Sequence, residues 1–155
     1  MSTVTDTNGN SVDVKINRTQ TRALIDTGSY FTCINANFSH RTGLEIIPPN
    51  MNTPTTMLGA DGTQLDVMGS ATANISIAGY MHTVDSVVVN DLFHNVILGI
   101  DVLRQLRAVI DIHSGTLSIA DDLITVPLIR RFSARNILRT TSCVTILCLS
   151  DNVLG

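Results

Sequence analysis

Residues 23–29 read Ala-Leu-Ile-Asp-Thr-Gly-Ser, and this stretch decides how the rest of the chain is interpreted. Its apolar residues predict a strand that delivers the carboxylate of Asp26 to a tight turn at Thr27 and Gly28. Glycine lets the backbone bend and lets another chain approach closely. The hydroxyl of Ser29 is within reach of the carboxylate. Since Asp-Thr-Gly is also ordinary turn chemistry, the stretch by itself does not define an active site.

A second informative stretch, residues 95–103, reads Asn-Val-Ile-Leu-Gly-Ile-Asp-Val-Leu. Residues 96–98 are continuously apolar, which predicts a short strand buried on both faces. From residue 99 to residue 106 the apolar side chains recur with helical spacing. Leu98 and Gly99 are therefore expected at a junction between a buried strand and a helix.

Short strands and turns are expected to fill the region between these two stretches. Residues 55–58 and 63–67 flank Gly59-Ala60-Asp61-Gly62, which predicts a hairpin with a glycine-rich tip. Residues 69–77 alternate as a long strand, and residues 36–42 allow one or two helical turns. Regularly spaced short strands with one late helix predict an all-β fold, a closed barrel with one short C-terminal helix.

Length and pattern divide the chain into two parts. A chain of 155 residues suits one compact domain, assigned to residues 1–120. The periodic pattern loosens after Ala120, so residues 121–155 are interpreted as a C-terminal extension or a linker within a polyprotein. A strand remains possible at 123–128.

Composition excludes several classes of protein. Charged residues make up 15% of the chain and apolar residues 44%, which is typical of a globular domain. The net charge of −3 and the lack of a basic face argue against nucleic-acid binding. No apolar run approaches the ~18 residues of a membrane span. An odd number of cysteines without paired spacing indicates a reducing, intracellular location.

In these features the sequence resembles the retropepsin family, the proteases of retroviruses and LTR retrotransposons with cellular relatives in ubiquitin-shuttle proteins. The family has an Asp-Thr/Ser-Gly-Ala/Ser motif, a glycine-rich flap, and an apolar-apolar-Gly strand that leads into one helix. All three occur here in that order, over about residues 8–120. The details look closest to gypsy-type retrotransposon proteases and the ubiquitin-shuttle branch.

The resemblance implies roles for particular residues. Asp26 matches the catalytic aspartate, Thr27 the threonine that braces two active-site loops across a dimer axis, and Gly28 a contact to the substrate backbone. Ser29 would donate a hydrogen bond to the carboxylate, and Leu98 and Gly99 would support the active-site loop from below. The flap is expected at 57–63, with substrate-binding positions at Met57, Leu58, Gly59, Ala60, Asp61 and Gly62.

Two positions depart from the viral pattern. Viral members often pair an acid two residues after the motif glycine with an arginine after the helix-leading glycine. Here these positions hold Tyr30 and Ile100, so the ion pair is missing as a whole and leaves no unpaired charge. Because this ion pair is missing, dimer stability must come from other contacts. The flap tip is also less rich in glycine than in many viral enzymes and carries Asp61.

One aspartate in such a motif implies a two-fold homodimer. Peptide hydrolysis by this chemistry needs two carboxylates, one ionised to activate water and one protonated to polarise the carbonyl. The chain has one Asp-Thr-Gly motif, so the second Asp26 would come from another copy. The resulting prediction is an aspartic endopeptidase without metal or cofactor, active on a retroelement polyprotein. A cellular or domesticated relative, or a non-catalytic dimerisation or peptide-binding module, remains an alternative.

Overall fold

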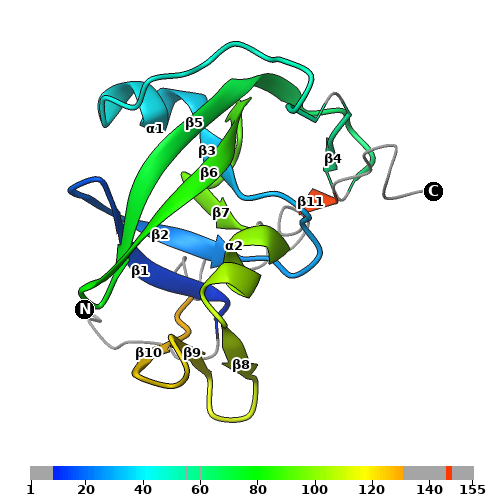
Figure 1. The fold of residues 1–155 in the computed structure, drawn as a ribbon. Coiled ribbons are helices and arrows are strands. Elements are labelled where there is room, and N and C mark those ends of the chain that lie inside the picture. Colours follow the sequence, from blue (N-terminus) through cyan, green and yellow to red (C-terminus); the bar gives the residue numbers. More distant parts are fainter. Residues whose placement is uncertain (1–8, 55, 60, 131–145, 148–155) are drawn as a thin grey trace, which may run out of the picture.

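The computed structural model describes residues 9–54, 56–59, 61–130 and 146–147. Six strands close into a barrel, as Figure 1 shows, in the order β1-β2-β7-β3-β6-β5. In that order their bounds are Ser11–Ile16, Thr19–Ile25, Val96–Leu98, Cys33–Asn35, Tyr80–Asn90 and Asp66–Ile77. The prediction of an all-β closed barrel is confirmed.

The barrel is filled by aliphatic side chains from alternating strand positions. In β1, Val12, Val14 and Ile16 are buried while Asp13 and Lys15 are exposed, as the period of two requires. All three residues of β7 are buried, because Val96 and Leu98 pack into the barrel core and Ile97 packs into a second apolar cluster. Each fully buried aliphatic side chain contributes about 1.5–3 kcal/mol. The barrel core thus holds the ends of β2 and β7 in fixed positions.

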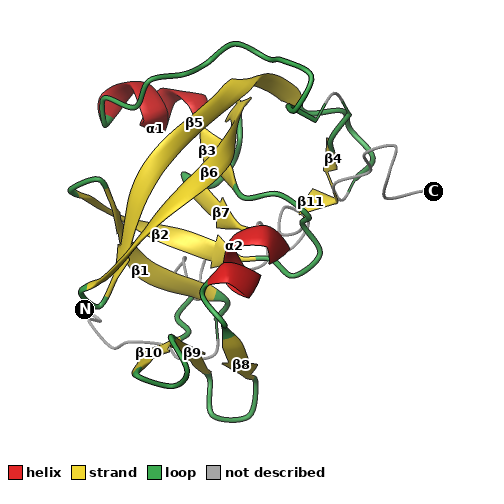
Figure 2. Ribbon diagram, in the orientation of Figure 1, coloured by secondary structure: helices red, strands yellow, loops and turns green. Residues whose placement is uncertain are grey.

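Two short helices flank the barrel, where the sequence predicted one C-terminal helix and possible helical turns at 36–42. Helix α1 (Ala36–Arg41) begins where the Asn35 side chain accepts a hydrogen bond from the Phe38 N–H at 3.0 Å. It ends before Gly43, whose φ of 75° suits glycine. Helix α2 (Ile100–Gln105) follows β7 as expected. Figure 2 shows α1 and α2 in red on different sides of the barrel.

A small three-stranded sheet follows α2, with the order β10-β9-β8. Its strands are β8 (Val109–Asp111), β9 (Thr116–Ile119) and β10 (Ile124–Pro127). After β10, Ile129 exchanges backbone hydrogen bonds with Ser11 at 3.0 and 2.7 Å. The folded unit therefore continues past Ala120 as far as residue 130, because β10 and Ile129 pair with the domain. Most of the predicted extension, at 131–145 and 148–155, lies outside the described residues.

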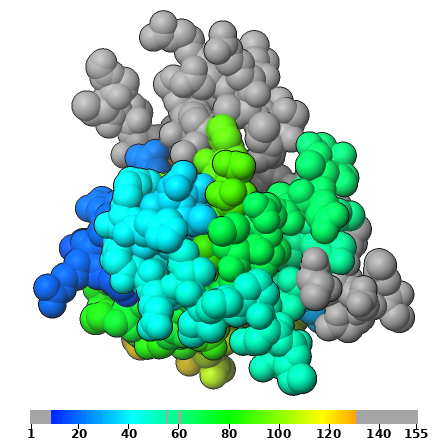
Figure 3. Space-filling model, turned by 90° about the horizontal axis from the view of Figure 1, so that it is seen from above, coloured from blue at the N-terminus to red at the C-terminus, as the bar shows by residue number. Residues whose placement is uncertain are grey.

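A second, two-stranded sheet joins β4 (Leu58–Gly59) to β11 (Ile146–Leu147). β4 belongs to the predicted flap, and Figure 1 draws it above the loop that joins β2 to β3. Seen from above in Figure 3, the surface runs continuously from α1 in cyan to the flap region in green. Neither described helix is long and apolar enough to span a membrane.

Candidate active site

Asp26 follows directly after β2, where two parallel strands end together. Ile25 is paired with Leu98 of β7, and the N–H of Asp26 donates to the Leu98 carbonyl oxygen at 3.0 Å. Because the carboxyl ends of parallel strands meet at one edge, the turn after β2 and the turn after β7 lie side by side. The Asp26 side chain is 6% exposed. The fold thus holds the carboxyl group of Asp26 at the edge where β2 and β7 end.

The turn at residues 26–29 holds the carboxylate by backbone contacts. The Gly28 N–H donates to Asp26 Oδ1 at 2.9 Å, and the Ser29 N–H donates to the Asp26 carbonyl oxygen at 3.1 Å. Thr27 and Gly28 are exposed, whereas Asp26 and Ser29 are buried. A hydrogen bond from a backbone N–H favours the ionised form of a carboxyl group. The loop therefore presents Thr27 and Gly28 outward beside a positioned acid.

The Ser29 hydroxyl ties the active-site loop to its own backbone. It donates to the carbonyl oxygen of Phe31 at 2.7 Å. Ser29 thereby stiffens the loop that carries Asp26. The expected hydrogen bond from Ser29 to the Asp26 carboxylate stays a prediction.

Gly99 packs directly against the active-site loop. A Cβ atom at this position would lie 2.6 Å from the carbonyl carbon and oxygen of Phe31 and 2.8 Å from the Ser29 carbonyl oxygen. The next residue, Ile100, donates its N–H to that same Ser29 oxygen at 2.8 Å. Glycine is therefore required here because a neighbouring backbone approaches closely.

A polar network that the sequence analysis missed joins the loop to α2. Asp101 accepts hydrogen bonds from the Thr32 N–H at 3.1 Å and the Thr32 hydroxyl at 2.7 Å. Thr32 Oγ1 also accepts from the Gly99 N–H at 3.0 Å. Asp101 lies in the first turn of α2, and its partner Thr32 is 69 residues away in the sequence. Asp101 and Thr32 fix the position of the loop relative to the helix.

The flap hairpin is built on a tight turn around Asp61. The Gly59 N–H donates to the Thr63 carbonyl oxygen at 2.8 Å, and the Leu65 N–H donates to the Met57 carbonyl oxygen at 2.7 Å. Asp61 Oδ1 accepts from the Thr63 N–H at 2.9 Å. This backbone bond and the Thr63 side chain hold the pKa of the Asp61 carboxyl below its usual 3.8. Asp61 is therefore ionised at mildly acidic pH.

The predicted flap positions differ in their surroundings. Met57 is fully buried and packs with Leu24, Val89 and Ile97 in an apolar cluster that is separate from the main barrel core. Its side chain thus anchors the base of the flap in the core. Leu58 and Gly59 are half-buried, and Asp61 and Gly62 are exposed. Ala60 lies outside the described residues.

Asp26 is the only buried acidic residue among the described residues. Asp101 is hydrogen-bonded to Thr32. In the described part of the chain, no group of three or more His, Cys, Asp or Glu side chains gathers in a way that would hold a metal ion. Among its described residues, one chain therefore contributes one buried acid to the site, Asp26, next to the ends of β2 and β7.

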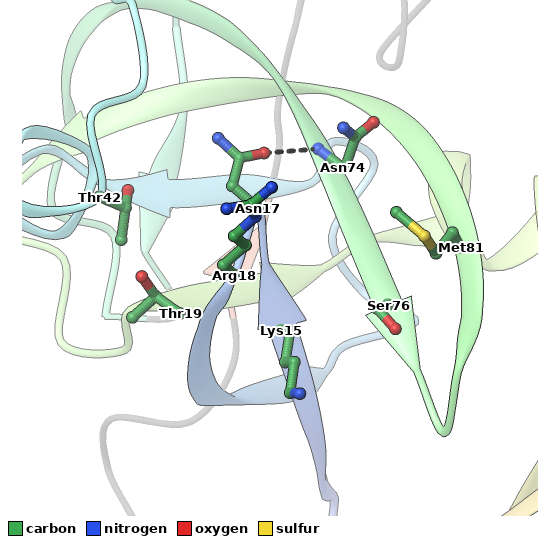
Figure 4. Close-up of a pocket in the computed structure, with 8 residues that line it drawn as sticks. All are labelled: Lys15, Asn17, Arg18, Thr19, Thr42, Asn74, Ser76 and Met81. Atoms are coloured by element: carbon green, nitrogen blue, oxygen red, sulfur yellow. Dashed lines mark hydrogen bonds between the residues drawn. The ribbon is translucent and has the colours of Figure 1, made fainter.

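A separate hollow lies at the turn between β1 and β2, shown in Figure 4. Its wall includes Lys15 and Arg18, and Asn17 Oδ1 accepts a hydrogen bond from the Asn74 N–H at 3.0 Å. None of its lining residues is acidic. It cannot supply the carboxylate chemistry expected near Asp26, and it is not part of the candidate site.

The fold and the positioned Asp-Thr-Gly turn define a retropepsin-type aspartic protease scaffold. The model of the gag-polyprotein aspartyl protease family matches residues 12–105, which is more than half of the chain. The chain belongs to this family. The match includes the Asp26 turn, the flap and the junction at Gly99. No curated protein matches the sequence.

Solved structures of retropepsins share the fold. The retroviral protease-like domain of Ddi1 from Leishmania major is 21% identical, with a TM-score of 0.62 over 77% of this chain and 93% of that one. The EIAV protease, solved with the inhibitor HBY-793, is 24% identical, with a TM-score of 0.50 over 63% of this chain and 86% of that one. Both similarities establish the barrel architecture.

Proposed function

We propose that the chain is an aspartic endopeptidase that acts as a homodimer, with one Asp26 from each copy in a shared site. The observation that carries this proposal is the buried carboxylate of Asp26 on a loop whose next residues, Thr27 and Gly28, are exposed. The described residues of one chain place no other acid in that position. A second copy related by a two-fold axis would supply the missing carboxylate.

The proposed chemistry is attack by an activated water without a covalent intermediate. Two carboxylates held close together cannot both ionise, so the pair shares one proton. The ionised Asp26 takes a proton from water, and the protonated Asp26 donates to the carbonyl oxygen of the scissile peptide. Aspartic proteases as a class divide the roles in this way. The Gly28 N–H, which donates to Asp26 Oδ1 at 2.9 Å, favours the charged partner.

A surface next to the loop fits a second copy of the chain. Exposed Thr27 borders a hollow whose apolar wall includes Ile100, Leu103 and Ile110. Nearby, β8 is an edge strand of its sheet, and Val109 is 56% exposed. An exposed apolar edge strand readily pairs with another strand. These contacts would take the place of the ion pair that Tyr30 and Ile100 cannot form.

The substrate class in this proposal is an extended polypeptide, bound as an added strand between the flap and the floor. Membership of a family of gag-polyprotein proteases supports the polyprotein of a retroelement as the natural substrate. An intracellular location, in the cytoplasm or in a retroelement particle, belongs to the same proposal. Its support is the odd number of cysteines without paired spacing.

The proposal is tested by incubating the full chain with a mixed peptide library from about pH 3 to about pH 8 and reading new termini by mass spectrometry. We expect cleavage of extended, apolar sequences with an optimum below about pH 7, since one acid of the pair must keep its proton. An optimum above about pH 8 would exclude the shared-proton mechanism. No cleavage by a confirmed dimer would favour a peptide-binding module.

A further inference from the structure

The outer edge of flap strand β4 is occupied by a segment from the far end of the chain. β4 pairs antiparallel with β11, so that Ile146 lies opposite Gly59 and Leu147 lies opposite Leu58. Figure 1 draws β11 in red between β4 and the loop that joins β2 to β3. The flap edge therefore already has a partner strand.

The hydrogen bonds of the hairpin identify which backbone groups face this partner. Met57 and Gly59 turn their polar groups toward the returning strand, through the bonds to Leu65 and Thr63 at 2.7 and 2.8 Å. Successive residues of a strand turn their backbone groups to opposite edges. The N–H and C=O of Leu58 therefore point to the outer edge, where Leu147 is the paired residue. This is the edge at which an added strand would bind.

We propose that the outer edge of β4 binds short, extended apolar segments by strand addition and that Ile146–Leu147 is its resident ligand. Around this pair, residues 143–149 read Cys-Val-Thr-Ile-Leu-Cys-Leu, which is apolar apart from Thr145. The C-terminal region of the chain then competes with substrates for the flap. The part of this inference that concerns substrates rests on the proposed function, whereas the strand contact does not.

Strand addition explains why an apolar segment of the same chain fits this edge. Main-chain pairing supplies affinity that depends little on sequence, and alternate side chains supply the preference. Gly59 has no side chain, which allows a second backbone to approach closely. A tethered ligand acts at an effective concentration that reaches about the millimolar range. A substrate must displace β11 before it pairs with Leu58.

Two proline variants of the full chain separate the strand contact from other effects. Leu147→Pro removes the N–H of the residue paired with Leu58, so it breaks the strand. Ile146→Pro is the matched control, since the N–H at this position points away from β4 and proline is tolerated there. Both changes are made together with Asp26→Asn, which prevents self-cleavage. Neither residue belongs to the barrel, and circular dichroism is used to check that each variant is folded.

The first readout is hydrogen exchange at the Leu58 amide. We expect exchange to become at least about tenfold faster in Leu147→Pro than in the parent chain. Loss of the Leu147 N–H releases the strand from β4, and the Leu58 amide is then no longer protected by pairing. Ile146→Pro is expected to change the exchange rate less than about twofold. Equal exchange in the parent and Leu147→Pro would overturn the proposal.

The second readout is binding of a fluorescent peptide with the sequence of residues 143–149, with serine in place of both cysteines. We expect the peptide to bind at least about fivefold more tightly to Leu147→Pro than to Ile146→Pro, because the internal competitor is released. Equal affinities would contradict the proposal that the outer edge of β4 binds apolar segments. Neither readout uses catalysis, so a failure of the proposed protease function appears separately, as absence of cleavage by the chain that retains Asp26.

Discussion

Replacing Asp26 with Asn is expected to lower the rate of peptide cleavage by about a thousandfold or more, which corresponds to at least about 4 kcal/mol of transition-state stabilisation. An amide neither accepts a proton from water nor donates one to the carbonyl oxygen, so both roles of the carboxyl pair are lost. The amide oxygen still accepts from the Gly28 N–H, which donates at 2.9 Å in the native turn. The fold should therefore survive the change.

The matched control for this variant is Asp66→Asn. Asp66 is exposed on β5 and accepts a hydrogen bond from the Asn90 side chain at 3.3 Å. We expect its cleavage rate to stay within about twofold of the parent, since exposed substitutions away from a site change little. The measurement is the initial rate on one peptide taken from the library, with thermal unfolding as a check of folding. Comparable rates for Asp26→Asn and Asp66→Asn would refute the assignment of Asp26 as the catalytic residue.

Replacing Gly99 with Ala is expected to destabilise the protein by about 3 kcal/mol and to impair cleavage at the same time. The new methyl group would lie 2.6 Å from the backbone of Phe31 and 2.8 Å from the Ser29 carbonyl oxygen. Because these are backbone atoms, the strain cannot be relieved by a side-chain rotation. The loop that carries Asp26 must shift, or Gly99 must move away from it.

The control for Gly99→Ala is Gly79→Ala, in the turn between β5 and β6. Gly79 has a φ of 87° but nothing within 4 Å of a new Cβ atom, so the expected cost is about 1 kcal/mol of backbone strain. Urea denaturation of both variants gives the free energies of unfolding. If Gly99→Ala is as stable as Gly79→Ala and cleaves like the parent, the close packing beneath the loop has no functional importance.

Local sequence patterns were sufficient to predict the barrel and the surroundings of Asp26. An apolar run followed by Asp-Thr-Gly predicted the end of β2, and the run at Val96–Leu98 predicted the buried strand beside it. These features depend on residues that are neighbours in sequence. The position of Gly99 beneath the loop was implied by the family resemblance and not by the local pattern.

Features that depend on distant partners could not be predicted. The hydrogen bonds of Asp101 to Thr32 join residues far apart in the chain, and no periodicity indicates which acid a buried threonine meets. The same holds for β11, whose described pairing with β4 consists of two residue pairs. Met57 looked like a flap residue, but its fully buried side chain belongs to the core. Side-chain direction in a hairpin depends on its register against the barrel.

The measurement that tests the shared site most directly is a subunit-mixing experiment. Wild-type chain is allowed to exchange with an equal amount of Asp26→Asn chain, and cleavage is compared with that of unmixed wild type at the same total concentration. If each site needs Asp26 from two copies, random pairing leaves about a quarter of the dimers active, so the rate should fall to about a quarter of the unmixed value. A rate of about half would mean that each wild-type chain acts with its own Asp26 alone, which would contradict the account.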